Sequence, residues 1–135
     1  MKTKVGFLAG NFDVIHPGYI RMFRDAKSVC DKLIVGLHTD PTIERPHKLK
    51  PILSTYERTE TLLELRSVDD VVCYDTEADL VNLLKDLKPD VRILGTDYKG
   101  TRFTGDELGI DIYYHSRDPF WSTTRFKKLI AESLR

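Results

Sequence analysis

Apolar and polar positions follow two patterns along the chain: short continuous apolar runs, and longer stretches in which apolar residues recur at helical spacing. The continuous runs predict five strands, at residues 4–9, 33–37, 71–74, 91–94 and 110–114. The intervening stretches predict amphipathic helices, and a final helix follows the last strand. Strands that are apolar throughout are buried on both faces, which is typical of a parallel sheet covered by helices. We therefore predict one doubly wound (Rossmann-like) α/β domain over residues 1–135, with a five-stranded parallel sheet and helices on both faces.

Local signals indicate where the helices begin. Pro17 follows the first strand after a short turn, and proline is favoured at the first position of a helix. Ser54 is followed three residues later by Glu57, which is the spacing of a capping box. We expect the first helix to begin at Pro17, the second directly after Ser54 and the last near Ser122.

Composition limits the classes of partner. The 135-residue chain has 21 Lys plus Arg and 21 Asp plus Glu, so it has no overall attraction for nucleic acid or an anionic membrane. No apolar stretch reaches the length of a membrane span, and the N-terminus lacks a signal-peptide pattern. Cys30 and Cys73 lack metal-binding spacing and are interpreted as reduced core thiols of a cytoplasmic protein, with a disulfide as the alternative. Because positive and negative charges balance over the whole chain, any anion site must come from a local group of residues.

The turn between the first strand and the first helix is the strongest candidate for chemistry. Residues 10–19 read Gly-Asn-Phe-Asp-Val-Ile-His-Pro-Gly-Tyr. The first N–H groups of a helix lack intrahelical partners and lie at the positive end of its dipole, so this junction can bind a phosphate chain. Gly10 and Gly18 could instead serve only a tight turn, and His16 could be a helix-end residue satisfied by the backbone.

The same stretch resembles the signature G-x-F-D-x-x-H-x-G-H of the cytidylyltransferase-like nucleotidyltransferases. Tyr19 stands where that signature has its second histidine. The resemblance implies catalytic roles for His16 and Tyr19. It implies a nucleotide-binding turn made of Gly10, Asn11, Phe12, Asp13 and Gly18.

A second signature precedes the last predicted helix. Residues 117–124, Arg-Asp-Pro-Phe-Trp-Ser-Thr-Thr, resemble the R-T-E-G-I-S-T-T box of the same family. An arginine can bind phosphate oxygens bidentately, while hydroxyl groups and free N–H groups bind others. The resemblance implies a catalytic role for Arg117 and nucleotide binding by Ser122, Thr123 and Thr124, although Ser122 could be an ordinary helix cap. Trp121 could pack in the core or cover the base.

Further positions match the family over shorter segments. Lys48 and Lys50 lie in the loop after the second strand, and Lys48 is assigned as the catalytic lysine that meets the triphosphate. Arg66 and Asp97 are assigned to nucleotide binding by the resemblance. Arg66 could instead lie at a subunit interface or pair with a nearby aspartate, and Asp97 could belong to an ordinary polar turn. Arg58 also matches a family arginine, but could belong to the exposed face of its helix.

The resemblance implies transfer of a nucleoside monophosphate. In this family an acceptor phosphate oxygen attacks the α-phosphorus of a nucleoside triphosphate in line and pyrophosphate leaves, with Mg²⁺ held mainly by the phosphates. The nearest pattern is the glycerol-3-phosphate cytidylyltransferase branch, so the resemblance implies CTP as a substrate and a homodimer. Because the chain is short, we expect a small, glycerol phosphate-like alcohol rather than a sugar as the acceptor. The alternatives are an ATP-dependent adenylyltransferase of the superfamily and a nucleotide-binding module impaired in catalysis because Tyr19 replaces a histidine.

Overall fold

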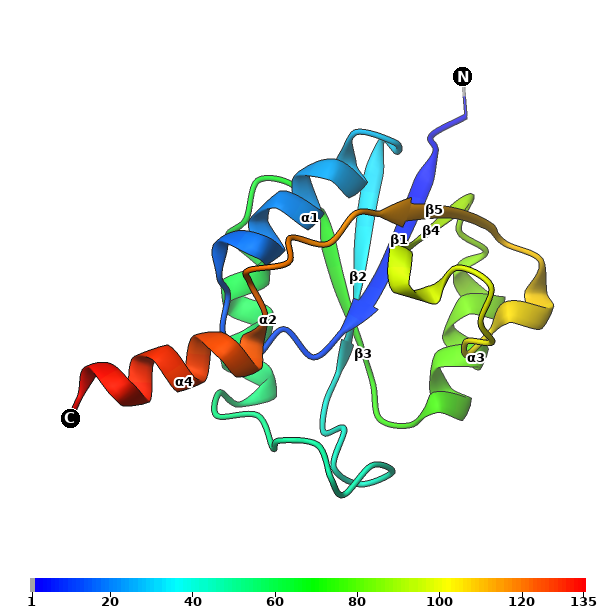
Figure 1. Cartoon of the computed structure of the whole chain (residues 1–135). Coiled ribbons are helices and arrows are strands. Elements are labelled where there is room, and N and C mark those ends of the chain that lie inside the picture. The colour runs from blue at the N-terminus through cyan, green and yellow to red at the C-terminus, as the bar shows by residue number, and fades with distance from the viewer. Residues whose placement is uncertain (1) are drawn as a thin grey trace.

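Residues 2–135, described by a computed structural model, form a five-stranded sheet with helices packed on both faces (Figure 1). The strands are β1 (Val5–Gly10), β2 (Lys32–His38), β3 (Asp70–Tyr74), β4 (Val91–Gly95) and β5 (Asp111–His115). Their order is β3-β2-β1-β4-β5, and every neighbouring pair is parallel. This confirms the predicted fold class; β5 begins and ends one residue later than its apolar run indicates.

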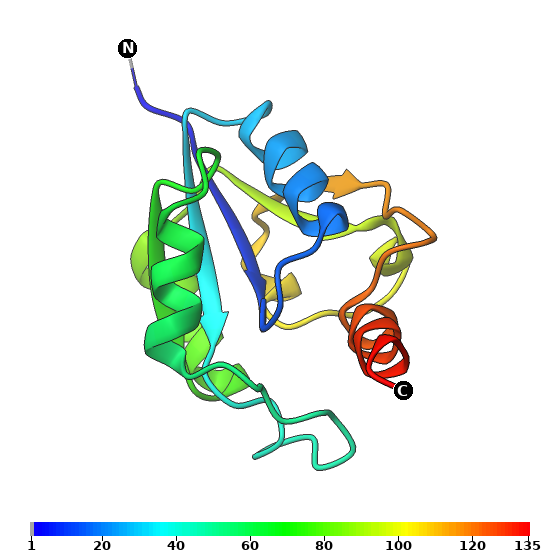
Figure 2. The ribbon, with the colours of Figure 1, turned by 90° about the vertical axis from the view of Figure 1, so that its left-hand side faces the viewer.

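The helices are α1 (Pro17–Lys27), α2 (Thr55–Leu63), α3 (Glu77–Leu87) and α4 (Thr123–Ser133). The first three cover the sheet, whereas α4 has no buried residue and projects away from it (Figure 1). Phe23 of α1 and Leu62 of α2 pack into one buried cluster with Leu8, whereas Leu80 of α3 packs with Phe7 in a second cluster. Because Phe7 and Leu8 are successive strand residues that point to opposite faces, α1 and α2 cover one face of the sheet and α3 the other. Figures 1 and 2 show this arrangement.

The helix starts follow the predicted signals, with one informative difference. Pro17 is the first residue of α1, Ser54 and Glu57 form a capping box on α2, and Ser122 caps α4 by accepting a hydrogen bond from Arg125 N–H. The α3 helix also has a capping box, but α1 has no side-chain cap. Pro17 has no N–H group, and those of Tyr19 and Ile20 donate to the carbonyl oxygen of His16 at 3.0 and 3.3 Å. At the amino terminus of α1 the N–H group of Gly18 therefore stays available for another acceptor.

The strand order places the ligand-binding edge. Successive crossovers run outward from β1 in both directions, so the order reverses between β1 and β4, where α/β folds form a crevice at the carboxyl ends of the strands. The loops after β1, β2, β4 and β5 meet at this edge, and Figure 2 shows the loop of residues 39–53 extending beyond it. Within residues 2–135 no helix combines the length and apolar character that crossing a bilayer requires.

The two cysteines differ in environment. Both are free; Cys30 is half-buried, and its sulfur would lie 2.7 Å from a Cβ added to Gly6. Cys73 is exposed, so its interpretation as a core thiol is wrong. The apolar run of β3 indicated a fully buried strand, but β3 lies at the edge of the sheet, where part of its surface stays open.

Candidate active site

A cavity of about 870 Å³ lies at the carboxyl ends of β1 and β4. It brings together residues of both sequence signatures and of the long loop after β2. The predicted residues that line it are Gly10, Asn11, Phe12, Asp13, His16, Gly18, Tyr19, Lys48, Arg117, Ser122, Thr123 and Thr124. Two segments that are about a hundred residues apart in sequence therefore form one site, as the two resemblances require.

Asp13 fastens the turn after β1 to two other parts of the chain. Its buried carboxylate accepts hydrogen bonds from the N–H groups of Ile52 (2.8 Å) and Leu53 (2.9 Å) and pairs with Lys127 Nζ at 2.6 Å. Burial alone would raise the pKa of Asp13, but Lys127 and the two N–H groups hold it below the ordinary value of 3.8. The ionised carboxylate thus joins the turn, the loop after β2 and α4.

Replacing Asp13 by asparagine is expected to lower the free energy of unfolding near neutral pH by about 3 kcal/mol, because Lys127 loses its partner in a buried setting. A carboxylate whose pKa is lowered by folding stabilises above its unfolded pKa, and this contribution is lost as the pH falls through the folded pKa. Urea denaturation of the natural protein and Asp13→Asn should therefore show a gap that narrows from about pH 5 toward about pH 2. Asp86→Asn, at an exposed site on α3, is the control. A constant gap at all pH values would contradict this role of the charge.

The buried His16 side chain is stacked between the rings of Tyr19 and Trp121. Its ring stacks on Tyr19 with centroids 4.0 Å apart and lies 5.7 Å from the Trp121 ring, with only 4% of the residue exposed. Gly18 allows this close approach, because an added Cβ would lie 2.7 Å from Trp121 Cβ. Neither ring nitrogen of His16 has a hydrogen-bond partner within residues 2–135, and burial lowers the pKa of His16. A neutral imidazole with one donor and one acceptor is thus present in the cavity, without a polar partner of its own.

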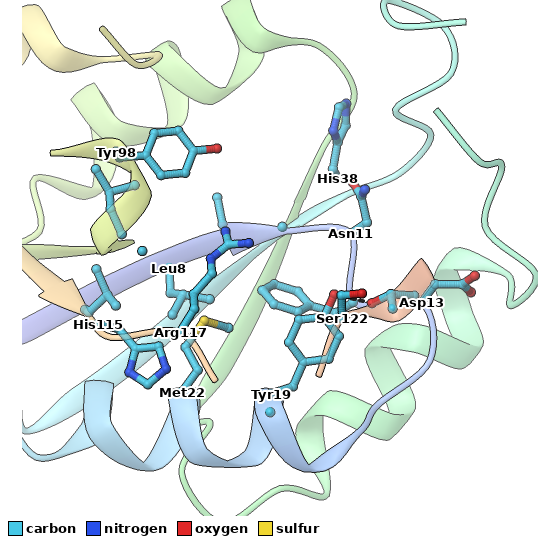
Figure 3. Close-up of a pocket in the computed structure, with 18 of the residues that line it drawn as sticks. Leu8, Asn11, Asp13, Tyr19, Met22, His38, Tyr98, His115, Arg117 and Ser122 are labelled. Atoms are coloured by element: carbon cyan, nitrogen blue, oxygen red, sulfur yellow. Dashed lines mark hydrogen bonds between the residues drawn. The ribbon is translucent and has the colours of Figure 1, made fainter. Parts of the chain in front are cut away.

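Tyr19 connects the two signatures. Its phenol oxygen lies 2.5 Å from Thr123 Oγ1, at the start of α4, and its ring meets Phe12 edge-on at 5.2 Å. Burial raises the pKa of Tyr19, so the phenol stays protonated and can donate. Figure 3 shows Tyr19 pointing from α1 toward Ser122 and the cavity. Tyr19 therefore holds hydroxyl groups of both signatures together.

Arg117 reaches the crevice from the segment after β5. Its side chain is largely exposed, and its Nε lies 3.3 Å from Asp97 Oδ1. A Cβ added to Gly95 would lie 2.6 Å from the same Nε, so the glycine at the end of β4 makes room for the guanidinium. Figure 3 shows Arg117 extending toward β1 between His115 and the centre of the cavity. The guanidinium is thus positioned where β1 and β4 diverge.

Other predicted residues have different placements. Asp97 is absent from the cavity wall but pairs with Arg117, and Lys50 is also absent from the wall that Lys48 lines. Arg66 does not reach the cavity: it is exposed in the segment before β3, at the amino-terminal edge of the sheet. The structure therefore gives no support to nucleotide binding by Arg66, because the order of the elements places it at the opposite edge.

Arg58 is buried rather than exposed. It is 1% exposed, and its guanidinium donates to the carbonyl oxygens of Leu53, Asn11, His38 and Thr39. The residue lies on the inner face of α2, and its hydrogen bonds hold the loops after β1 and β2 in place. Its role is to position the cavity wall.

Lys127, Arg92 and Tyr98 are among the residues of the cavity wall that sequence analysis did not identify. Lys127 stands four residues after Thr123, on the same face of α4, and this helical spacing was a usable signal. Arg92 is a charged residue within the apolar run of β4, which also marks it as unusual. Tyr98 follows β4 in a short 3₁₀ turn (Thr96–Tyr98) and carried no distinctive pattern.

The cavity is suited to a polyanion. Its carboxylates already have cationic partners: Asp13 pairs with Lys127, Asp118 with Arg21, Glu77 with Arg45 and Asp106 with Arg102. In the part of the chain that the structure describes, no three His, Cys, Asp or Glu side chains are grouped as a metal site. Arg117, Lys48 and the N–H groups of Gly18, Thr123 and Thr124 can bind phosphate oxygens.

Comparisons with known proteins found a matching family model and similar proteins. A family model described as cytidylyltransferase-like matches residues 7–108. The chain is 38% identical over 106 residues to the bifunctional protein HldE of Hyphomonas neptunium, covering 78% of this chain and 22% of that protein. It is 39% identical over 106 residues to HldE of Caulobacter vibrioides, again covering 78% of this chain and 22% of the relative. The chain thus spans less than a quarter of the length of these curated relatives.

Solved structures show the same fold. A lipopolysaccharide core biosynthesis protein from Thermoplasma volcanium is similar with a TM-score of 0.73 and 28% identity, covering 87% of this chain and 99% of that one. Pantothenate synthetase from Thermus thermophilus has a TM-score of 0.61 at 15% identity, covering 92% of this chain and 64% of that one, and shares the fold alone.

Proposed function

The chain belongs to the cytidylyltransferase-like family of nucleotidyltransferases, and from this premise we propose that it transfers a nucleoside monophosphate from a nucleoside triphosphate to a phosphorylated alcohol. The observation that carries the proposal is the meeting of both signatures, residues 10–19 and 117–124, in one cavity at the order reversal of the sheet. Free helix N–H groups, an arginine and an unpartnered histidine suit the phosphates of a nucleotide.

In the proposed reaction, an oxygen of the acceptor phosphate forms a bond to the α-phosphorus while the bond from that phosphorus to the bridging oxygen of the β-phosphate breaks. Pyrophosphate leaves with the electron pair, so no covalent enzyme intermediate is required. Catalysis then consists of aligning the two reactants and stabilising charge on the phosphorane oxygens and the leaving group. We propose that Mg²⁺ enters with the triphosphate and neutralises part of its charge.

The residues have distinct roles in this scheme. The uncapped amino terminus of α1 receives the triphosphate, and neutral His16 donates a hydrogen bond to it. Arg117 and Lys48 neutralise the transferring and leaving groups, while Ser122, Thr123 and the first N–H groups of α4 bind the leaving pyrophosphate. Because Trp121 covers His16, nucleotide binding must shift Trp121 from its stacked position.

The proposed nucleotide is CTP, from the resemblance of residues 117–124 to the CTP-using branch. Trp121 is the chain's single tryptophan, so its fluorescence should report the shift that the mechanism requires. We expect CTP to change this fluorescence at a lower midpoint concentration than ATP, and to bind more weakly as salt is raised because the contacts are to phosphates. Parallel calorimetric titrations give the two affinities. Equal or tighter binding of ATP would contradict the choice of CTP and favour the adenylyltransferase alternative.

A sugar-sized acceptor is the second candidate for the other substrate. The resemblance favoured glycerol phosphate, but the cavity of about 870 Å³ also has room for a larger acceptor beside the nucleotide. The Thermoplasma volcanium neighbour is named for lipopolysaccharide core biosynthesis, which also favours a sugar phosphate. Pyrophosphate release with glycerol phosphate and with hexose phosphates distinguishes the two acceptors.

A further inference from the structure

Arg92 is a charged residue at a buried position of β4. It is aligned with Phe7 of β1 and lies on the face of the sheet that α3 covers, with 4% of the residue exposed. Its Nη1 donates to the carbonyl oxygen of Thr104, and its guanidinium lies 5.3 Å from the Phe103 ring centre. Its Nε is buried without a hydrogen-bond partner, and within residues 2–135 Arg92 forms no ion pair. The buried guanidinium of Arg92 therefore lacks part of its hydrogen bonding and any carboxylate partner within residues 2–135.

The surroundings of Arg92 leave positive charge in excess. We call the part of the cavity lined by Arg45, Tyr74, Glu77, Arg92, Tyr98, Arg102, Phe103, Thr104 and Asp106 the Arg92 subsite. It contains three arginines and two carboxylates, and each carboxylate is paired with an arginine other than Arg92: Glu77 with Arg45 at 3.0 Å and Asp106 with Arg102 at 2.6 Å. Burial lowers the pKa of Arg92, but an arginine stays protonated in proteins. One positive charge is therefore left for a ligand.

The Arg92 subsite is continuous with the catalytic end of the cavity but lies on another side of β1. Figure 3 shows Tyr98 on one side of β1 and Tyr19 on the other. Arg92 precedes Gly95 by three strand residues, which is about 10 Å along the sheet. The Arg92 guanidinium contacts Phe103 and Thr104, which belong to neither signature, so a group that it binds is distinct from the attacking phosphate. It would be the opposite end of the same acceptor molecule.

We propose that the Arg92 subsite binds the acceptor, and that Arg92 recognises an anionic group, a carboxylate or a second phosphate, at the end of the acceptor far from its attacking phosphate. This inference rests on the proposed nucleotidyl transfer and specifies its acceptor class. Three bonds of an extended chain span about 3.8 Å, so the seven bonds between the phosphorus and the far carbon of a six-carbon phosphate span about 9 Å. An acyclic or ring-opened six-carbon sugar derivative with two anionic ends matches this length.

The test compares two ligands that differ only at the far end. 6-Phosphogluconate carries a carboxylate where glucitol 6-phosphate carries a CH₂OH group. Calorimetry with the natural protein should give an affinity about ten- to hundredfold higher for 6-phosphogluconate, the range expected for a hydrogen bond between charged groups. Glucitol 1,6-bisphosphate is the third ligand, and its affinity relative to 6-phosphogluconate identifies which anion Arg92 prefers.

Variants of Arg92 test whether this residue causes the difference in affinity between 6-phosphogluconate and glucitol 6-phosphate. In Arg92→Met the ratio of the two affinities should fall to about one, and in Arg92→Lys it should be intermediate, because an ammonium keeps the charge but lacks the planar fork. Arg24→Met removes an exposed arginine of α1 outside the cavity and should keep the full ratio. Unchanged nucleotide binding by Arg92→Met, measured by Trp121 fluorescence, verifies that the variant is folded.

Equal binding of the acid and the alcohol by the natural protein, or no binding of either, overturns the inference. A ratio that persists in Arg92→Met overturns it as well, and leaves Arg92 as a tie between β4 and the loop at Thr104. The proposed transfer reaction is tested by a separate measurement, and the absence of acceptor-dependent pyrophosphate release would contradict it. Because the calorimetric comparison needs no turnover, the two failures are distinguishable.

Discussion

Arg117→Ala is expected to lower kcat by about 10²–10³-fold, the usual effect of removing one preorganised group that stabilises transition-state charge. Arg117 lines the cavity beside Gly95, and its side chain is 61% exposed. Its ion pair with Asp97 is also exposed, and such pairs add little to stability. The melting temperature should therefore change little. Steady-state pyrophosphate release and thermal denaturation of the same preparations measure both effects.

Two further variants test this explanation for Arg117. Arg117→Lys should recover activity only in part, since a point charge cannot bind two phosphate oxygens in a fixed geometry. Arg125→Ala is the matched control, because Arg125 lies in the same region over the Phe120 ring and does not line the cavity. A large loss of stability in Arg117→Ala, with normal specific activity of the folded fraction, would make Arg117 structural.

Tyr19→Phe is expected to lower kcat by about 10²–10³-fold while leaving nucleotide affinity nearly unchanged. In the structure the phenol lies 2.5 Å from Thr123 Oγ1, so it already joins the hydroxyl group that the mechanism assigns to pyrophosphate. The substitution removes the donor but keeps the ring that stacks on His16. Tyr19→His should keep activity and add a pH-dependent limb near neutrality, because histidine has an unperturbed pKa of about 6.5.

The control for Tyr19 is Tyr113→Phe. The hydroxyl of Tyr113 also bonds to α1, through Asp25 at 2.9 Å, but Tyr113 lies outside the cavity wall. Its removal should leave kcat unchanged. Equal rates for the natural protein and Tyr19→Phe would exclude the donor role, whereas activity that appears only in Tyr19→His would identify the chain as a nucleotide-binding module impaired in catalysis.

The fold was predictable because its signals are local. Continuous apolar runs identified all five strands, and proline and serine signals identified the starts of α1 and α2. Cys73 was misplaced because an apolar run does not reveal whether its strand lies at the centre or at the edge of a sheet. Arg58 was left between two readings because its partners are carbonyl oxygens of distant loops, which no sequence spacing indicates.

The candidate site was predictable where a contiguous motif supplies it. The two signatures provided most of the cavity wall around Gly10, His16 and Arg117. The stacking of Trp121 on His16 and the ion pair of Asp13 with Lys127 depend on how α4 packs against α1, which sequence patterns do not specify. The expected homodimer and the role of Mg²⁺ stay predictions.

The measurement that tests the central claim most directly is steady-state pyrophosphate release by the natural protein. Each assay contains Mg²⁺, either CTP or ATP, and one phosphorylated alcohol from a set that includes glycerol 3-phosphate and six-carbon phosphates. Nucleotidyl transfer predicts release that depends on the acceptor and equals the amount of nucleotide-linked product formed. No release with any combination, under conditions in which Trp121 fluorescence shows that the nucleotide is bound, would contradict an enzymatic role.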